Sequence, residues 1–317
     1  MDDPLRLKQQ LQSGDFSETR QYLARSRKAH DWQDRCFLLN LLAPSLPIDA
    51  LTAASDAEPN AADLLLLLGA YYFQRVGQSR GTKTAELTTG EQFGGAEIHL
   101  QNMMECLLRV YELDRDDPTP HIFALRGLVV FTEHHSAVKQ EYAEAIRLAP
   151  DCVPAHFAMV NARSQKWGGS HEESLAIARA AMRSGKLGGD MPVCLFVAHF
   201  FVWQYARNFN KNKVEAEQYI KDPTVNQELN QALERWIGGS YLMSRSSVPY
   251  LHQAALWYYL SGDYTRLQRI LRIIGNIPCD QVWKQIGDPA KTYSAALQKT
   301  PTPVPVKKAG FLDWFKR

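Results

Sequence analysis

The chain has 317 residues, of which 45% are hydrophobic and 22% charged, the values of an ordinary globular protein, which exclude a disordered or collagen-like chain. Its 36 lysine and arginine residues against 34 acidic ones leave a formal net charge of only +2. Because a protein dedicated to nucleic acid normally carries a strongly basic domain, this balance predicts that nucleic acid is not a partner.

The first residues and the cysteines both favour a cytoplasmic protein. Residues 1–4 are acidic and a polar run follows them, whereas a secretory signal starts basic and continues apolar. The five cysteines are an odd number and are widely spaced, without a C-x-x-C pair. We therefore expect reduced, mostly buried thiols rather than disulfides or a zinc site.

Helical signals dominate the chain, and strand signals are nearly absent. Long stretches carry apolar residues at three- and four-residue spacing and are separated by glycine or proline. Alternating β-branched runs closed by Asn-Gly or Asp-Gly do not occur in the sequence. This pattern predicts an all-α fold.

A Ser-Gly-Asp-aromatic motif occurs twice, at residues 13–16 and 261–264. A glycine at this place can take the left-handed conformation, which lets two antiparallel helices reverse tightly. We therefore expect helix pairs joined at these turns, with Gly262 in the left-handed conformation.

An apolar run at residues 64–73 is followed by a polar segment, 74–95, that is rich in glycine and threonine. The first is too short to span a membrane. The second is expected to be an insertion between two helices rather than a regular helix. Because exposed loops often carry function, Arg80 in this segment is a candidate contact with a ligand or partner, although a solvated linking loop fits the same pattern.

Helix ends recur along the middle of the chain. Pro118 and Pro150 each end a helix, and their separation is close to the period of about 34 residues of tetratricopeptide repeats. Residues 250–275 form a further helix pair, but the spacing drifts and no complete consensus repeat is present. The sequence predicts a right-handed α-solenoid of degenerate tetratricopeptide-like helix pairs over residues 1–299.

Several short motifs also resemble an uncharacterised bacterial family, a domain of unknown function built on such helix pairs: Asp31-Trp32, Arg35, Pro59, Arg80-Gly81, Asp117-Pro118 and Trp167-Gly168-Gly169-Ser170. The resemblance covers about residues 5–185. It divides the helical domain into a family-like part, 1–185, and further helix pairs, 186–299. It implies a helical fold and a bacterial origin and brings no activity.

Three of the Gly-Gly pairs stand out, at residues 94–95, 168–169 and 238–239. They favour either tight turns between helices, with Trp167 packed on a neighbouring helix, or backbone amide nests that bind an anion. The most apolar segment of the chain, 191–206, is again too short for a membrane span and predicts a helix buried on all sides.

A solenoid of helix pairs offers a concave surface that binds other proteins. Its first helices would present His156, Asn161, Trp257 and Tyr258 in that groove. A basic helix edge with three-residue spacing, which is either solvated or faces an acidic partner, consists of Arg266, Arg269 and Arg272.

The end of the chain has an unusual composition. Residues 300–310 are rich in proline and lysine and predict a stiff linker, and residues 311–317 form an aromatic and basic peptide. Its apolar side chains are candidate partner contacts: Phe311, Leu312, Trp314 and Phe315. Docking to a partner, weak contact with a membrane surface, and packing on the chain's own groove are the alternatives.

The residue patterns indicate no catalytic site, no metal site and no cofactor. Histidines lie singly or adjacent rather than at metal-chelating spacing, and nucleophile-elbow and phosphate-loop motifs do not occur in the sequence. We expect a non-catalytic scaffold or adaptor that binds one or more proteins in the cytoplasm. The alternatives are a peripheral membrane assembly factor that uses the tail, and a small-ligand or enzymatic protein with its site near Arg80 and the Gly-Gly loops.

Overall fold

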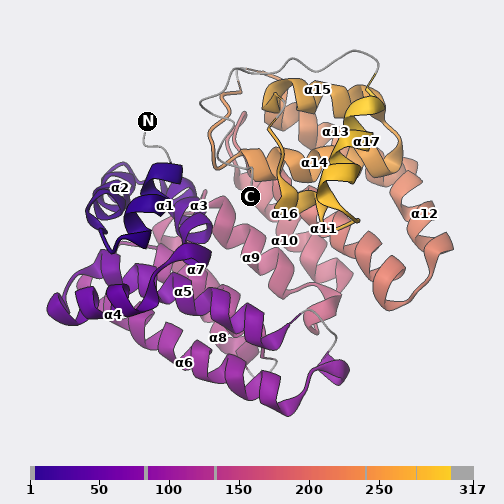
Figure 1. Cartoon of the computed structure of the whole chain (residues 1–317). Coiled ribbons are helices and arrows are strands. Elements are labelled where there is room, and N and C mark those ends of the chain that lie inside the picture. Colours follow the sequence, from indigo (N-terminus) through magenta and orange to yellow (C-terminus); the bar gives the residue numbers. More distant parts are fainter. Residues whose placement is uncertain (1–3, 82–84, 132–133, 240, 276, 301–317) are drawn as a thin grey trace. The chain divides into compact units, whose positions relative to one another are not determined.

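The computed structural model describes residues 4–81, 85–131, 134–239, 241–275 and 277–300 (Figure 1). Every regular element in these ranges is a helix, which confirms the all-α fold. The chain divides into two compact units, unit 1 (Met1–Ala162) and unit 2 (Arg163–Arg317). The boundary at residue 185 comes from the family resemblance alone and stays a prediction.

Unit 1 contains nine α-helices among its described residues, with two short 3₁₀-helices, Ala43–Ser45 and Ala85–Leu87. The α-helices are α1 (Pro4–Gln12), α2 (Ser17–Lys28), α3 (Trp32–Leu42), α4 (Ile48–Ala57), α5 (Ala62–Arg80), α6 (Gly90–Leu113), α7 (Thr119–Leu128), α8 (His135–Leu148) and α9 (Val153–Ala162).

Consecutive helices of unit 1 pack as pairs, and α5 and α6 run side by side (Figure 1). The alternate helices α3, α5, α7 and α9 also contact one another in succession. Two glycines allow the closest approaches. A Cβ atom on Gly69 would lie 2.7 Å from Leu107 Cδ2, and one on Gly127 would lie 2.4 Å from Met103 Cε. A larger residue at either position would therefore require Leu107 or Met103 to shift from its present place.

The expected polar insertion at residues 74–95 is shorter than the sequence suggested. Helix α5 continues to Arg80, and α6 already begins at Gly90, so the Gly94–Gly95 pair lies inside a helix rather than in a turn. The reason is a capping box at Thr89: its hydroxyl accepts from Gln92 N at 3.2 Å, and its own N–H donates to Gln92 Oε1 at 3.0 Å. Gly95 lies beside Ser79, where a small residue helps α6 to pack against α5.

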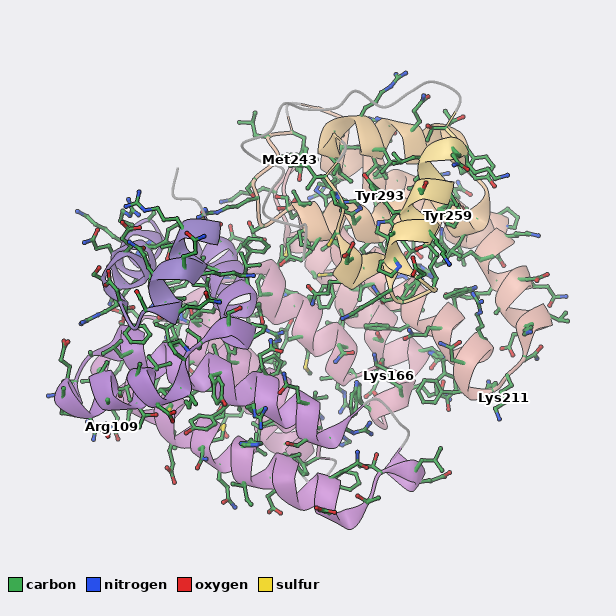
Figure 2. All side chains as sticks on the ribbon, in the orientation of Figure 1. Arg109, Lys166, Lys211, Met243, Tyr259 and Tyr293 are labelled. Atoms are coloured by element: carbon green, nitrogen blue, oxygen red, sulfur yellow. The ribbon has the colours of Figure 1, made fainter. Side chains whose placement is uncertain are left out.

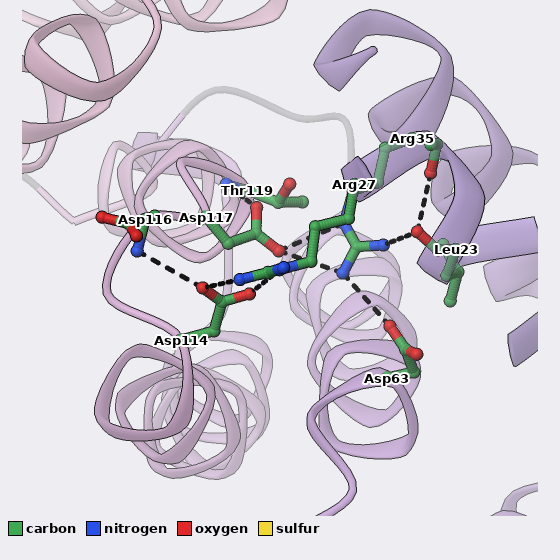
Figure 3. A network of polar contacts seen from close by, with 9 residues as sticks. Leu23, Arg27, Arg35, Asp63, Asp114, Asp116, Asp117 and Thr119 are labelled. Atoms are coloured by element: carbon green, nitrogen blue, oxygen red, sulfur yellow. Dashed lines mark hydrogen bonds and ion pairs between the residues drawn. The ribbon is translucent and has the colours of Figure 1, made fainter. Parts of the chain in front are cut away.

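A buried ion-pair network ties α2, α3, α5 and the start of α7 together (Figure 3). The side chain of Arg35 is 1% exposed, and its guanidinium group donates to Asp117 Oδ2 at 3.1 Å and to Asp63 Oδ1 at 3.2 Å. It also donates to the Leu23 carbonyl oxygen. The other oxygen of Asp117 accepts from Thr119 N at 2.8 Å and so fixes the first turn of α7.

Unit 2 contains the remaining helices of the described chain. They are a 3₁₀-helix (Gln165–Trp167), α10 (His171–Ser184), α11 (Val193–Gln204), a π-helix η5 (Tyr205–Phe209), α12 (Lys213–Lys221), α13 (Pro223–Ile237), α14 (Val248–Ser261), α15 (Tyr264–Ile274), α16 (Asp280–Trp283) and α17 (Pro289–Gln298).

The core of unit 2 is built around α11 and α14. Every residue of α11 from Val193 to Phe200 is buried, which confirms the expected all-round burial for this part of the helix, whereas Phe201 and Val202 are half-buried. Trp236, Trp257 and Trp283 have no exposed surface. Among the helices that the structure describes, none combines the length and the hydropathy needed to cross a bilayer.

The predicted glycine turns and thiols are confirmed. Gly14 and Gly262 both take the left-handed conformation, with φ of 80° and 83°. The 168–169 pair forms a turn between helices in which Gly168 is left-handed and Ser170 caps α10. All five cysteines are free, and four of them are buried.

Candidate functional site

A cleft of about 270 Å³ opens between α6, α7 and α8 of unit 1. We call it the acidic cleft, and its lining residues are Met104, Leu107, Leu108, Tyr111, Pro120, His121, Ala124, Gln140, Glu141 and Glu144. This lining contains two carboxylates and no lysine or arginine. The cleft therefore combines an apolar wall with a negative one.

His121 lies in the inner part of the acidic cleft and is only 8% exposed. Its Nδ1 is 2.7 Å from Glu141 Oε2, and the Tyr111 ring lies edge-on against it at 5.0 Å. In the neutral imidazole, an Nδ1–H that donates to this carboxylate leaves the lone pair of Nε2 to accept a hydrogen bond. That Nε2 is buried, and it has no hydrogen-bond partner among the described residues.

The walls of the acidic cleft differ in polarity, because α6 contributes apolar side chains and α8 contributes carboxylates. Leu108 on α6 is 57% exposed, although it is a large apolar side chain. Opposite it, Glu144 on α8 accepts from Arg147 Nε at 2.8 Å and remains partly exposed. The pair of Pro118 and Pro120 sets the start of α7, and this places His121 in its first turn.

The acidic cleft brings a few polar groups together beside an apolar wall. A carboxylate and a histidine in contact resemble the orienting part of a catalytic dyad, but the lining includes no serine, threonine or cysteine that His121 could activate. Among the residues that the structure describes, no group of three or more potential ligands is placed to hold a metal ion. What remains is a hydrogen-bond acceptor between two carboxylates and an apolar wall.

A second polar cluster lies inside unit 2, around His199 on α11. Its Nδ1 is 2.7 Å from the hydroxyl of Tyr219, and its Nε2 is 3.1 Å from Glu228 Oε2. Glu228 also accepts two hydrogen bonds from Arg179, at 2.7 and 2.9 Å. Both ring nitrogens of His199 are thus occupied, and the cluster joins α10, α11, α12 and α13.

The cluster makes the stability of unit 2 depend on pH. The hydrogen bonds from Arg179, with that of His199, lower the pKa of Glu228 to about 2. Because this is below the ordinary value of 4.5, the stabilisation is complete above about pH 5 and is lost as the pH falls towards 2. We expect Glu228→Gln to cost about 1–3 kcal/mol at pH 7 and to make stability less dependent on pH between 5 and 2. Urea denaturation at each pH measures both effects, and an unchanged acid slope would contradict the assignment.

The structure places the predicted contact residues of unit 1 as follows. Arg80 is half-buried at the last residue of α5 and donates to the Gly81 carbonyl oxygen at 3.4 Å. His156 is buried, with its ring between the Tyr142 hydroxyl at 2.9 Å and the Pro150 carbonyl oxygen at 2.8 Å, and burial lowers its pKa. Asn161 is half-buried on α9. Of the three, His156 is therefore not a groove side chain.

Trp257 and Tyr258 are not groove residues either, because neither has any exposed surface. Trp257 Nε1 donates to Asn226 Oδ1 at 3.0 Å, and the Tyr258 hydroxyl donates to Asn230 Oδ1 at 3.0 Å. The expectation of a groove position fails because α11, α12, α15 and α16 all pack against α14 and leave these two side chains no open face.

The basic edge of α15 is already engaged. Arg266 pairs with Asp263 on its own N-terminal turn, and Arg269 pairs with Glu234 on α13. Trp167 is half-buried at the end of the 3₁₀-helix before Gly168. The four tail candidates lie outside the described residues: Phe311, Leu312, Trp314 and Phe315. Contact with a partner stays a prediction for Arg80, Asn161, Trp167, Arg266, Arg269 and the tail.

The sequence interpretation missed the acidic cleft entirely, although one signal was available. Glu141 and Glu144 are three residues apart and therefore share a face of α8. That face meets the single histidine of α7, which only the packing of the two helices reveals.

In comparisons with known proteins, no family model, no curated protein and no solved structure matches the chain.

Proposed function

We propose that this chain is a non-catalytic binding protein that holds a segment of a partner protein in the acidic cleft. The observation that carries the proposal is the lining itself, where exposed Leu108 faces two carboxylates and the unpartnered Nε2 of His121. A buried acceptor without a partner costs free energy, and an occupant that donates an N–H recovers it.

The same lining defines the chemistry of the partner segment. Glu141 and Glu144, of which Glu144 is shared with Arg147, attract a cation, and His121 Nε2 accepts from an N–H donor. Met104, Leu108 and Tyr111 offer apolar surface to the stem of a long side chain or to its neighbour. A lysine or arginine beside a leucine-like residue satisfies all three features.

The packing of unit 1 supports the finer fold proposal of a right-handed α-solenoid with tetratricopeptide-like helix pairs. In such repeats, the first helix of each pair contacts its own partner helix and the first helix of the next pair. Helices α3, α5, α7 and α9 follow this succession. A scaffold role, and the cytoplasmic location that the cysteines favoured, belong to the same proposal.

Calorimetric titration of the full chain tests the acidic cleft directly. A peptide in which leucine and arginine alternate should bind, and its affinity should fall as salt is added. The matched peptide with glutamate in place of arginine should not bind. The L108S/E144Q double variant should bind the first peptide at least about tenfold more weakly, because it removes one apolar and one charged contact.

The chain offers a matched control on α6. Ile98 is 59% exposed, nearly the same as Leu108, and its neighbour Glu97 is also exposed, but neither lines the acidic cleft. The E97Q/I98S double variant should bind the leucine–arginine peptide as the unaltered chain does. Equal losses in the two double variants would show that general surface charge, and not the cleft, attracts the peptide.

A further inference from the structure

Unit 2 contains an unusual backbone element at the end of its buried helix. After Gln204, α11 widens into the π-helix η5 (Tyr205–Phe209), closed by Asn210 N donating to Tyr205 O at 3.1 Å. Isolated π-turns of this kind often mark functional sites. Lys211 follows with a positive φ of 54°, and Figure 2 shows it at the turn that leads into α12.

This turn brings one face of α12 against the end of α11. Asn212 N donates to Ala206 O at 2.9 Å, and its side chain caps α12 by accepting from Glu215 N at 3.1 Å. The cleft that results has a volume of about 380 Å³. We call it the basic cleft, and its lining residues are Trp203, Arg207, Lys213, Ala216, Glu217, Ile220, Lys221 and Leu260.

The basic cleft is apolar inside and positive at its rim. Trp203, Ala216 and Ile220 are buried, whereas the three cations are exposed. The Arg207 guanidinium lies over the Trp203 ring, with Cζ 5.0 Å from the ring centroid. This stacking holds the guanidinium before any ligand arrives, and so lowers the entropic cost of binding.

The charges of the rim are not neutralised by the protein. Within the described chain, Arg207, Lys213 and Lys221 form no ion pair, and Glu217 is the one carboxylate among the lining residues. Three positive charges against one negative charge leave a local excess of two. A phosphate monoester carries a charge of about −1.5 to −2 at neutral pH and therefore matches this excess better than a single carboxylate does.

We propose that the basic cleft is a binding site for a phosphate monoester with an apolar body. The phosphate lies between Arg207, Lys213 and Lys221, and the apolar body enters between Trp203, Ile220 and Leu260. Arg207 supplies parallel N–H donors to two phosphate oxygens, and the lysines add point charges. The site does not depend on the acidic cleft, which lies in unit 1.

Titration calorimetry of the full chain with n-hexyl phosphate tests this site. Hexan-1-ol lacks the charge, and inorganic phosphate lacks the apolar body, so both should bind at least about tenfold more weakly than n-hexyl phosphate. The R207M/K221M double variant should lose at least about tenfold in affinity for n-hexyl phosphate. Both side chains are exposed, so the fold should be kept, and an unchanged circular dichroism melting curve verifies this.

A matched variant removes the same number and types of charge elsewhere in unit 2. Arg272 and Lys284 are exposed and lie outside the basic cleft, so R272M/K284M should bind n-hexyl phosphate with unchanged affinity. Equal losses in the two double variants would overturn the proposal. So would equal affinity for inorganic phosphate and n-hexyl phosphate, which would indicate an adventitious ion only.

A vesicle-binding experiment distinguishes the two possible sources of such a ligand, a lipid headgroup and a free metabolite. If the phosphate belongs to a lipid headgroup, vesicles of phosphatidylcholine with phosphatidic acid should bind the chain, and n-hexyl phosphate or R207M/K221M should abolish this binding. If the ligand is a free metabolite, n-hexyl phosphate binds and the vesicles do not. Vesicle binding that survives R207M/K221M, with no binding of n-hexyl phosphate, would overturn the site.

Discussion

Replacing Arg35 by methionine is expected to lower the free energy of unfolding of unit 1 by about 3–5 kcal/mol, because the change leaves the fully buried Asp117 and the half-buried Asp63 without their partner. The side chain of Asp117 has no exposed surface, and Arg35 is 1% exposed (Figure 3). Burial raises the pKa of Asp63, and the Arg35 charge opposes that shift. The single guanidinium therefore stabilises two carboxylates and one carbonyl oxygen on three separate segments.

Amide hydrogen exchange measured by mass spectrometry follows the two units separately. In the Arg35→Met variant, peptides from α3, α5 and α7 should lose protection against hydrogen exchange relative to the unaltered chain. Peptides from unit 2 should keep their protection. The matched control is Arg27→Met, because Arg27 pairs with Asp114 in the same region but is 46% exposed. That pair should contribute less than about 1 kcal/mol. If both variants lost equal protection, burial would not be the reason for the effect.

Sequence periodicity predicted turns and buried helices well, because these features depend on residues that are close together in the chain. Gly262 takes the left-handed conformation since the tight turn into α15 requires it. The buried helix α11 was visible because a helix covered on all sides is apolar on all sides. The Gly94–Gly95 pair wrongly predicted a turn, because the prediction considered only the local preference of glycine. Its two glycines disfavour a helix by about 1 kcal/mol each, but the capping box at Thr89 and the packing against α5 outweigh that local cost.

The candidate sites depended on contacts between segments that the sequence does not show to be neighbours. The position of Trp257 in the first helix of a pair indicated an open groove, but α11, α12 and α16 pack against α14 besides its partner α15. In contrast, the sequence does contain the helical spacing that places the lining residues of the basic cleft on common helix faces. Trp203 and Arg207 are four residues apart, and Lys213, Ala216, Glu217, Ile220 and Lys221 share one face of α12. The π-helix that turns these faces together could not be predicted.

The second large effect is expected in unit 2, at Asp190. This buried carboxylate is 8% exposed and accepts from Trp236 Nε1 at 2.8 Å, from the Tyr241 hydroxyl at 2.9 Å and from Ser247 Oγ at 2.6 Å. It thereby joins the loop before α11 to the end of α13 and the start of α14. Asp190→Ala leaves three donors without their acceptor, and we expect a loss of about 3–5 kcal/mol in the stability of unit 2.

The Asp190→Asn variant distinguishes the contribution of the hydrogen bonds to stability from the contribution of the negative charge. The amide oxygen can still accept from Trp236 and Tyr241, and Ser247 can accept from the amide nitrogen while its own hydroxyl turns to Ser244 Oγ, 2.7 Å away. We therefore expect Asn to cost clearly less than Ala in urea denaturation followed by tryptophan fluorescence. If Asn and Ala cost the same, the negative charge of Asp190 would hold this part of unit 2 together, and the geometry of its three acceptor contacts would be secondary. The expected order, with Asn the milder change, follows from the penalty for leaving the buried indole N–H of Trp236 and the buried Ser247 hydroxyl unpaired.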